Sequence, residues 1–346
     1  MKALVYQGPG KRSWQEAPSP ALLKPTDAIV KVTRTTICGS DLHILKGDVP
    51  EVTEGRILGH EAVGVVVDVG PAVSNFKAGD HVIVSCITSC GKCEGCKRGM
   101  PSHCTDGGWI LGHLIDGTQA ELVRVPHADG SLVLVPKGAD EDALVMISDI
   151  LPTGFECGVL KGEVKPGDAI AVVGAGPVGL AALMTAQFYS PAMSIAIDVD
   201  DNRLEVAKTF GATHVINSTD GKAALAVMAL TGQRGVDVAI EAVGAPVTFT
   251  LCQDIVAAGG HLANIGVHGH SVQLKMETLW SRNVTITTRL VDAVTTSMLL
   301  RTVLSSKLSP RKLITHEFAL GDMLKAYDVF GNAAREKALK VLLKAG

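Results

Sequence analysis

The feature that most constrains the fold is a buried strand that runs into a glycine-rich loop and then a helix. Ala169–Val173 is a continuous apolar run, and Gly174-Ala175-Gly176-Pro177-Val178-Gly179 follows it as G-x-G-x-x-G. Such glycines let the chain turn tightly and let backbone N–H groups approach a pyrophosphate at a helix N-terminus. Alternating strands and helices follow, which is typical of a parallel, doubly wound sheet. The expected elements are helices at 180–188 and 203–210 and strands at 194–198, 214–216, 236–241 and 261–265.

Asp198 ends the next strand, 24 residues beyond Gly174. A carboxylate there can accept hydrogen bonds from the ribose hydroxyls of a dinucleotide; the alternative is a cap for the following helix. Its charge would repel a 2′-phosphate by roughly 4 kcal/mol per pair of unit charges at about 4 Å and an effective dielectric constant of about 20. We therefore predict a preference for NAD over NADP. Arg203 could partly screen a phosphate, or could be a solvated helix residue.

The first half of the chain has a different pattern. Short β-branched runs at 28–32, 63–69, 81–84 and 132–135 are separated by Gly, Pro and Asp, which predicts a largely antiparallel β region. The apolar run at 338–343 predicts a last strand that rejoins this region. The predicted domains are therefore residues 1–152 with 292–346, and residues 153–291.

Composition excludes some function classes. The 346 residues carry a net charge of −3 with no basic run and 4% aromatic residues, so nucleic acid is not an expected partner. The first eleven residues contain no apolar stretch of signal-peptide length. Glycines interrupt the apolar run at 169–188, which favours a buried strand and helix over a membrane span. We expect a soluble, cytoplasmic protein that does not bind a membrane.

Four of the eight cysteines are clustered as C-x2-C-x2-C-x7-C, at Cys90, Cys93, Cys96 and Cys104. This spacing lets short loops bring four thiolates around one tetrahedral zinc ion, with no position left for a substrate, so a structural site is expected. The basic residues among the ligands, Lys92, Lys97 and Arg98, would offset the thiolate charge. The alternative is a set of reduced, unligated thiols.

A second group of possible zinc ligands is dispersed. Cys38 lies in ICGSDLH, and His60 and Glu61 lie in GHEAVGVVVDVG. A cysteine, a histidine and a carboxylate form a plausible zinc set with one position open for a substrate. Each of these residues alone is a weak signal.

Together, these motifs resemble the zinc-containing medium-chain alcohol dehydrogenases. The matching segments are Cys38-Gly39-Ser40-Asp41-Leu42-His43, Gly59-His60-Glu61, the four cysteines, the Gly174–Gly179 loop and Asp198, and they occur in the family's order. The resemblance implies an α/β protein with a GroES-like, mainly antiparallel β catalytic domain and a Rossmann domain. It also implies reversible hydride transfer from an alcohol to NAD.

The resemblance assigns the catalytic zinc to Cys38, His60 and Asp149. Asp149 is chosen because the family places a ligand four residues before a cofactor-contacting threonine, here Thr153; the residues alone do not separate it from Glu156 or Cys157. An aspartate there is similar to bacterial secondary-alcohol dehydrogenases and some formaldehyde dehydrogenases. Glu61 is implied to approach zinc when substrate is absent, with a buried carboxylate beside the ligands as the alternative.

Further residues take roles only through the resemblance. Protons are implied to pass through Ser40, the nicotinamide ribose and His43; the alternatives are a turn hydrogen bond and a surface histidine. Other implied cofactor contacts are Val243, Ile265 and Val267. The alcohol pocket is implied to contain Cys86, Trp109 and Leu290, although Trp109 could be ordinary core, and the small Cys86 favours a secondary alcohol. A homotetramer with two zinc ions per chain is expected.

Three alternative functions agree with the sequence to different extents. A formaldehyde or polyol dehydrogenase is compatible with the aspartate ligand. A zinc-free quinone reductase of the same superfamily conflicts with the intact ligand set. A non-catalytic NAD-binding regulator predicts loss of Cys38, Ser40 or His60, and all three residues are present.

Overall fold

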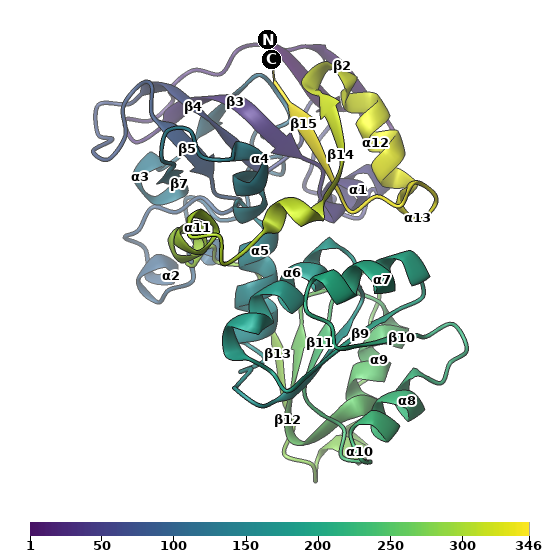
Figure 1. Ribbon diagram of the computed structural model, residues 1–346. Coiled ribbons are helices and arrows are strands. Elements are labelled where there is room, and N and C mark those ends of the chain that lie inside the picture. Colours follow the sequence, from purple (N-terminus) through teal and green to yellow (C-terminus); the bar gives the residue numbers. More distant parts are fainter. Residues whose placement is uncertain (346) are drawn as a thin grey trace. The chain divides into compact units, whose positions relative to one another are not determined.

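The computed structural model describes residues 1–345 (Figure 1). The chain divides into two compact units: Met1–Asp149 together with the chain from Asp292 onward, and Ile150–Val291. The sequence places the first junction at 152/153, three residues later, and the second at 291/292. The first unit is therefore built from two segments that are far apart in the sequence.

The second unit contains a six-stranded, all-parallel sheet. Its strands are β8 (Ala169–Val173), β9 (Met193–Asp198), β10 (His214–Asn217), β11 (Val236–Glu241), β12 (Val256–Asn264) and β13 (Thr285–Thr288). They lie in the order β10-β9-β8-β11-β12-β13, so the order reverses between β8 and β11. This confirms the predicted doubly wound sheet, in which ligands bind outside the carboxyl ends of the strands at the point of reversal.

Helices alternate with these strands. They are α5 (Ile150–Pro152), the π-helix η3 (Thr153–Leu160), α6 (Pro177–Ala186), η4 (Gln187–Tyr189), α7 (Asp201–Thr209), α8 (Ala223–Leu230), α9 (Pro246–Ile255) and α10 (Met276–Leu279). The expected start of α6 at residue 180 is wrong by three residues, because Gly176 is the N-cap and Pro177 takes the first helical position, where its missing N–H costs nothing. Helices α8 and α9 were not among the elements expected from the sequence.

The first unit is mainly antiparallel β structure, as predicted. Its larger sheet has the order β14-β15-β3-β4-β5-β7, with β6 on β3, and a separate hairpin pairs β1 with β2. Only β14 and β15 pair in parallel among the described strands of this unit. The strands are β1 (Lys2–Tyr6), β2 (Arg12–Glu16), β3 (Ala28–Thr36), β4 (Ala62–Val69), β5 (His81–Val84), β6 (Leu122–Val125), β7 (Leu132–Leu134), β14 (Ile314–Ala319) and β15 (Lys340–Lys344).

The last strand confirms the prediction that the chain returns to this region. β15 pairs antiparallel with β3, and its side chains join an apolar cluster with β1, α1 and α12. Fully burying an aliphatic side chain such as Ile44 or Val341 stabilises the fold by roughly 1.5–3 kcal/mol. The helices of this unit are α1 (Gly39–Lys46), α2 (Glu94–Lys97), η1 (Pro101–His103), α3 (Ala128–Ser131), α4 (Glu141–Leu144), η2 (Val145–Ile147), α11 (Thr296–Leu304), η5 (Pro310–Leu313), η6 (Leu320–Asp322), α12 (Met323–Gly331) and α13 (Ala333–Glu336).

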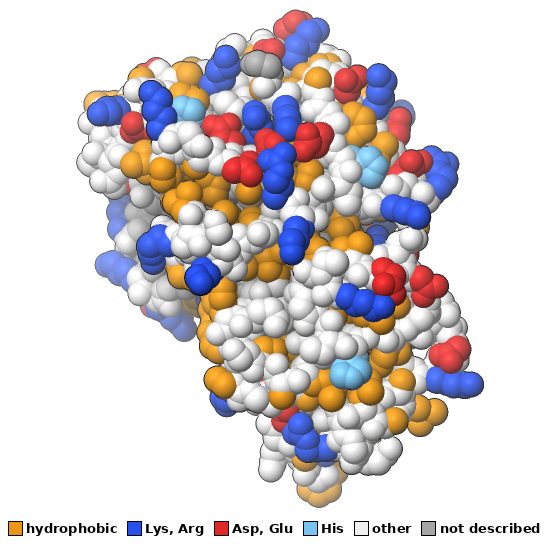
Figure 2. Space-filling model, viewed as in Figure 1, with side chains coloured by type: hydrophobic (Ala, Val, Ile, Leu, Met, Phe, Trp, Pro, Cys, Tyr) orange, Lys and Arg blue, Asp and Glu red, His pale blue; other side chains and the backbone are white. Residues whose placement is uncertain are grey.

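Charged side chains of both signs lie next to one another on the face shown in Figure 2. In the first unit, the Asp142 carboxylate pairs with Arg34 at 2.5 Å, Lys344 at 2.8 Å and Arg311 at 3.1 Å. These residues come from α4, β3, β15 and η5, so the ion cluster joins both segments of the unit.

Within residues 1–345, no single helix has both the length and the apolar composition needed to cross a membrane. One broken pair of short helices, Glu141–Ile147 and Ile150–Leu160, meets the criterion by length and composition together.

Candidate active site

The four clustered cysteines lie together in the first unit. Cys90 follows β5, Cys93 is the N-cap of α2, Cys96 lies in α2, and Cys104 follows η1. Their sulfur atoms all lie within 4.8 Å of one another. The backbone N–H of Cys93 donates to Cys90 Sγ (3.4 Å), and that of Cys90 donates to Cys104 Sγ (3.3 Å). Four sulfurs at this spacing match a closed tetrahedral metal site.

The thiols of this cluster ionise very unequally. Backbone N–H groups of Cys96 and Thr105 lower the pKa of Cys93 to about 6. Burial, together with the neighbouring Cys93, raises the pKa of Cys96 to about 12. One thiolate therefore opposes ionisation of the next, and a divalent cation would remove that repulsion.

Cys38, His60 and Asp149 form a second cluster in the same unit, with their ligand atoms within 4.8 Å of one another. Asp149 Oδ2 lies 3.3 Å from His60 Nε2 and 3.7 Å from Cys38 Sγ. Ligands bonded to zinc at about 2.0–2.3 Å in a tetrahedron lie roughly 3.3–3.8 Å apart. The three residues therefore fit a zinc ion and leave a fourth position open.

Local structure explains why two of these ligands meet. Cys38 is the N-cap of α1, so its position is fixed by the start of that helix. Gly59, just before His60, has φ of +93°, and a Cβ on it would lie 2.6 Å from Gln119 Cγ. Only glycine therefore allows the chain before β4 to pass so close to Gln119. The Cys86 backbone N–H donates to the Ser148 carbonyl (3.0 Å), which ties the residue before Asp149 to the end of β5.

The electrostatics of this cluster attract positive charge. Burial by itself would lower the pKa of His60, but Asp149 and Cys38 outweigh it and raise that pKa well above its ordinary value. Burial raises the pKa of Asp41, which lies 3.9 Å from the other ring nitrogen, Nδ1. Two potential anions thus face His60 Nε2, where a metal ion would also sit.

The two residues of the implied proton path lie on α1. The Ser40 hydroxyl oxygen is buried and has no hydrogen-bond partner within residues 1–345, so it is available to a ligand rather than used in a turn. His43 is about one-third exposed, and its Nδ1 lies 2.9 Å from Asp48 Oδ2.

Glu61 does not belong to the metal cluster in this structure. Its Oε2 accepts hydrogen bonds from the Thr36 hydroxyl and from Lys340 Nζ, the latter at 2.5 Å, and both charged side chains are almost fully buried. Its Oε1 is buried without a partner among the described residues. The arrangement observed is that of a buried carboxylate beside the ligands.

In the second unit, the glycine loop joins β8 to α6 as predicted. Gly174 has φ of +104°, and a Cβ on Gly179 would lie 1.8 Å from the Gly174 carbonyl oxygen. A Cβ on Gly176 would instead point into space approached only by Arg203, whose Nη1 lies 3.9 Å away. The loop therefore leaves room for a phosphate beside the N-terminus of α6, with a guanidinium nearby.

Asp198, at the carboxyl end of β9, is held against this loop. Its carboxylate accepts backbone N–H groups of Ala175 (2.7 Å), Val199 (2.8 Å) and Asp200 (3.0 Å), and the residue is 8% exposed. The alternative of a helix cap is wrong, because Asp200 caps α7.

Comparisons with known proteins agree with this geometry. A family model described as an alcohol dehydrogenase GroES-like domain matches residues 24–137, and one described as a zinc-binding dehydrogenase matches residues 177–304. The chain is 36% identical to an alcohol dehydrogenase of Cupriavidus necator, over 99% of this chain and 98% of that protein. The chain belongs to the zinc-containing alcohol dehydrogenase family. It is an oxidoreductase with zinc-dependent alcohol dehydrogenase activity.

The chain is also similar to two further dehydrogenases. It superposes with a TM-score of 0.96 on the apo form of zinc-dependent alcohol dehydrogenase 2 from Streptococcus pneumonia, at 54% identity over 100% of this chain and 98% of that one. It is 36% identical to the NADP-dependent isopropanol dehydrogenase of Thermoanaerobacter brockii, over 92% of both chains. The predicted pairing of a GroES-like domain with a Rossmann domain is thus confirmed.

The remaining expected cofactor residues of the dehydrogenase all lie in the second unit. Thr153 opens the π-helix, a form that is often found at functional sites. Val243 follows β11 and Ile265 follows β12, so both lie at carboxyl ends of parallel strands; β11 is the neighbour of β8, which carries the glycine loop, and β12 lies one strand further away. Val243 and Val267 are exposed at 49% and 64%, which leaves apolar surface available to a ligand.

The three expected pocket residues of the dehydrogenase are divided between the units. Cys86 is buried and Trp109 is partly buried in the first unit; the Trp109 ring stacks on His113 at 4.5 Å and meets the His60 ring edge to face at 6.2 Å. Leu290 lies in the second unit and is exposed. Trp109 therefore packs against the apolar core cluster, as the alternative reading expected, and also lies beside the His60 ring.

One buried carboxylate in the second unit, Glu241, was not among the residues expected from the sequence. Glu241, the last residue of β11, accepts backbone N–H groups of Val243 (3.1 Å) and Gly244 (3.0 Å) and the Thr248 hydroxyl (2.6 Å). His268 Nε2 lies 3.4 Å from its other oxygen. An acidic residue at the end of the mainly apolar strand β11 was the available signal, and it marks the residue that holds the loop containing Val243.

Proposed function

We propose that this dehydrogenase oxidises small or medium-sized secondary alcohols to ketones with NAD as the hydride acceptor, and catalyses the reverse reduction. The observation that carries this proposal is the cluster of Cys38, His60 and Asp149, whose spacing fits zinc with one open position. The Ser40 hydroxyl, two residues after Cys38 in the sequence, is buried without a hydrogen-bond partner in the described part of the chain. A zinc ion there would act as a Lewis acid that lowers the pKa of the alcohol hydroxyl.

The charge of the three ligands suits a neutral substrate. One thiolate, one carboxylate and one neutral imidazole balance the two positive charges of the ion, so an alcohol or ketone meets no net charge. Trp109, beside His60, adds a flat apolar wall.

Ser40 and His43 would move the proton that the alcohol loses. The Ser40 hydroxyl has no competing partner among the described residues and can donate or accept in turn. Asp48 accepts from His43 Nδ1, which leaves Nε2 as the atom that takes the proton. The dyad thereby fixes the tautomer needed for general-base work.

The preference for a secondary alcohol is supported by Cys86 and by the isopropanol dehydrogenase named above, whose substrate is a secondary alcohol. A small side chain at position 86 leaves room for a second carbon substituent. We predict a higher kcat/KM for 2-butanol than for 1-butanol. Cys86→Phe should reduce kcat/KM for 2-butanol more than for 1-butanol, by about 10- to 200-fold in their ratio, whereas Cys86→Ala should leave the ratio unchanged.

Steady-state kinetics with both alcohols, together with thermal unfolding of each variant, provide the measurement. Equal losses for the two alcohols in Cys86→Phe would remove position 86 from substrate selection. A wild type that strongly prefers 1-butanol would refute the secondary-alcohol proposal. The same kinetics are measured with a polyol and with formaldehyde. A higher kcat/KM for either would support the second candidate function, a polyol or formaldehyde dehydrogenase, which the aspartate ligand also permits.

The preference for NAD is supported by the carboxylate of Asp198 beside the glycine loop. We predict that kcat/KM favours NAD over NADP by at least about tenfold, or roughly 1.4 kcal/mol. Asp198→Gly should lower or invert the ratio of kcat/KM for NAD to that for NADP. Asp201 is exposed, and Asp201→Asn should leave this ratio unchanged. Because the Thermoanaerobacter brockii relative is named as NADP-dependent, a wild type that prefers NADP is a real alternative and would refute the assignment.

We also propose two zinc ions per chain, a homotetrameric assembly and a cytoplasmic location. Two ligand clusters support the zinc count, and thiolates that must stay reduced support a reducing compartment. The tetramer is supported by resemblance to bacterial relatives. Elemental analysis and light scattering of the purified protein would test the first two proposals directly.

A further inference from the structure

A chain of buried hydrogen bonds links the C-terminal segment of the first unit to the metal cluster. The Tyr327 hydroxyl, from α12, donates to Gln119 Oε1 at 2.8 Å. Gln119 Nε2 in turn donates to Asp41 Oδ2 at 3.0 Å and to the Thr36 carbonyl at 3.2 Å. Tyr327, Gln119 and Asp41 are each 1% exposed or less.

Asp41 connects this chain to two of the metal-cluster residues. Its Oδ2 also accepts the backbone N–H of Cys38 at 2.9 Å. Its Oδ1 has no hydrogen-bond partner in the described chain and lies 3.9 Å from His60 Nδ1. That distance is too long for a hydrogen bond, so Asp41 is a polar neighbour of Nδ1 rather than a direct partner. It occupies the Nδ1 side of the ring and leaves Nε2, on the Asp149 side, as the atom able to bind a metal.

We propose that Tyr327 and Gln119 are positioning residues that act through Asp41 to orient His60 for metal binding. A flipped Gln119 amide would place its oxygen against the Asp41 carboxylate. In the observed orientation, the Tyr327 hydroxyl donates a hydrogen bond to the amide oxygen. Burial raises the pKa of Tyr327 well above its ordinary value, so the phenol keeps the proton that it donates. The last segment of the chain thus helps to set the geometry of ligands encoded near its beginning.

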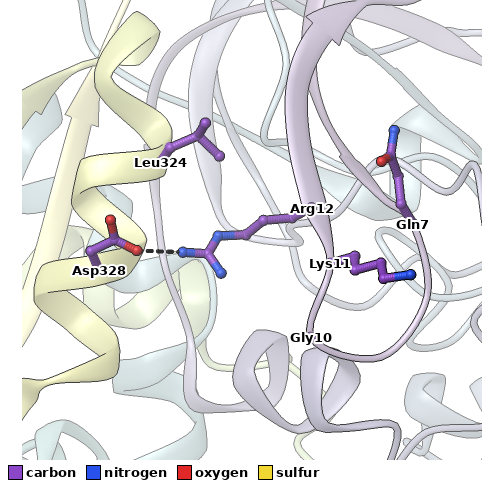
Figure 3. A pocket seen from close by; sticks show the side chains of 6 residues that line it. All are labelled: Gln7, Gly10, Lys11, Arg12, Leu324 and Asp328. Carbon is purple, nitrogen blue, oxygen red and sulfur yellow. Dashed lines mark hydrogen bonds and ion pairs between the residues drawn. The ribbon is translucent and has the colours of Figure 1, made fainter.

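Beyond Tyr327, these contacts continue to Arg12 at the protein surface. The Arg12 guanidinium lies 4.9 Å from the centre of the Tyr327 ring and pairs with Asp328 at 2.7 Å. Figure 3 shows Arg12 extending toward Asp328. Both residues line a surface pocket of about 470 Å³, together with Gln7 and Lys11. The tyrosine ring is therefore held from the outside while its hydroxyl points inward to Gln119, an arrangement that apolar packing alone does not require.

The test compares Tyr327→Phe and Gln119→Met with Tyr6→Phe. Tyr6 is buried in the same apolar cluster as Tyr327 but belongs to β1 and makes none of these hydrogen bonds, so it controls for the loss of a tyrosine hydroxyl. For each protein, zinc affinity is measured by competition with a chelator, and the visible spectrum is recorded after cobalt substitution. The metal bound by His60→Ala represents the four-cysteine cluster alone, so subtracting its signal from that of each protein isolates the three-ligand site. Thermal unfolding measures the stability of each variant.

The proposal predicts that Tyr327→Phe weakens metal binding at the three-ligand site roughly 10-fold and Gln119→Met up to about 100-fold. Both should alter the cobalt spectrum, while Tyr6→Phe alters neither quantity. Unchanged affinity and spectrum in folded Tyr327→Phe and Gln119→Met, with only a lower unfolding temperature, would overturn it. The inference rests on the proposed zinc ligands. If wild type and His60→Ala bind metal equally, that ligand assignment fails and the inference fails with it; the substrate and cofactor proposals are tested separately by kinetics.

Discussion

The two ligand clusters of this dehydrogenase differ in how far apart their residues lie in the sequence. The four cysteines fall within residues 90–104, whereas Cys38 and Asp149 are 111 residues apart. A local cluster can form as soon as one loop closes. The dispersed cluster requires β4, α1 and the end of η2 to be in place, so its geometry depends on the whole first unit.

The clusters also differ in charge and in closure. Four thiolates around a divalent ion would leave two excess negative charges. Cys93 and Cys96 ionise unequally, because backbone N–H groups lower the pKa of Cys93 and burial raises that of Cys96. The set of Cys38, His60 and Asp149 is balanced and has an open position. From this difference we expect the first cluster to stabilise its loop and the second to perform chemistry.

The largest expected effect is on turnover. His60→Ala should lower kcat/KM by at least roughly 10³-fold, because the Lewis acid contributes several kcal/mol of transition-state stabilisation. The fold should survive, since only one ring is removed from a cluster at the edge of the core. Alcohol oxidation rates and circular dichroism would be measured, with His316→Ala on β14 as a control. Substantial activity in His60→Ala would remove the distinction between the clusters.

The next effect is on stability. Cys96→Ser should release the metal of the four-cysteine cluster and lower the unfolding temperature by about 10 °C, because a structural zinc contributes directly to folding. Protein that remains folded should keep most of its activity per bound catalytic zinc. Calorimetry and zinc content are the measurements. Full stability with abolished turnover would mean that the roles of the two clusters are reversed.

The smallest effect concerns a charge cluster that needs no metal. Burial by itself would raise the pKa of Asp142, but hydrogen bonds from Lys344 and Arg34 outweigh it and hold the pKa below 3.8. The carboxylate therefore stabilises the fold fully above pH of about 4, and this contribution is lost as the pH falls through the lowered pKa. Asp142→Asn should cost about 1–3 kcal/mol at pH 7 and progressively less below pH 4.

Denaturant unfolding across this pH range would measure the difference. The exposed pair of Glu205 and Lys208 supplies the control, because Glu205→Gln should change stability by less than about 0.5 kcal/mol. A cost for Asp142→Asn that stays constant down to pH 2 would show that its ion pairs do not stabilise the fold.

Resemblance, rather than spacing, selected Asp149 over Glu156 and Cys157, and the structure brings Asp149 to His60 and Cys38. Asp198 was placed correctly at a strand end, but its hydrogen bonds to the glycine loop could not be foreseen, since they depend on how β9 lies beside β8. The start of α6 was misplaced because the apolar pattern begins after its proline.

The sequence by itself determined the features that depend on short separations: the alternation of strand and helix, the glycine loop, and the four-cysteine cluster. Their physical cause is local, because turn geometry, side-chain periodicity and the reach of one loop act over a few residues. Only the tertiary structure placed Lys340 on Glu61, and Tyr327 on Gln119 and through it on Asp41. A buried polar group needs a hydrogen-bond partner. Which residue becomes that partner depends on how distant segments pack, and a local sequence pattern does not predict this.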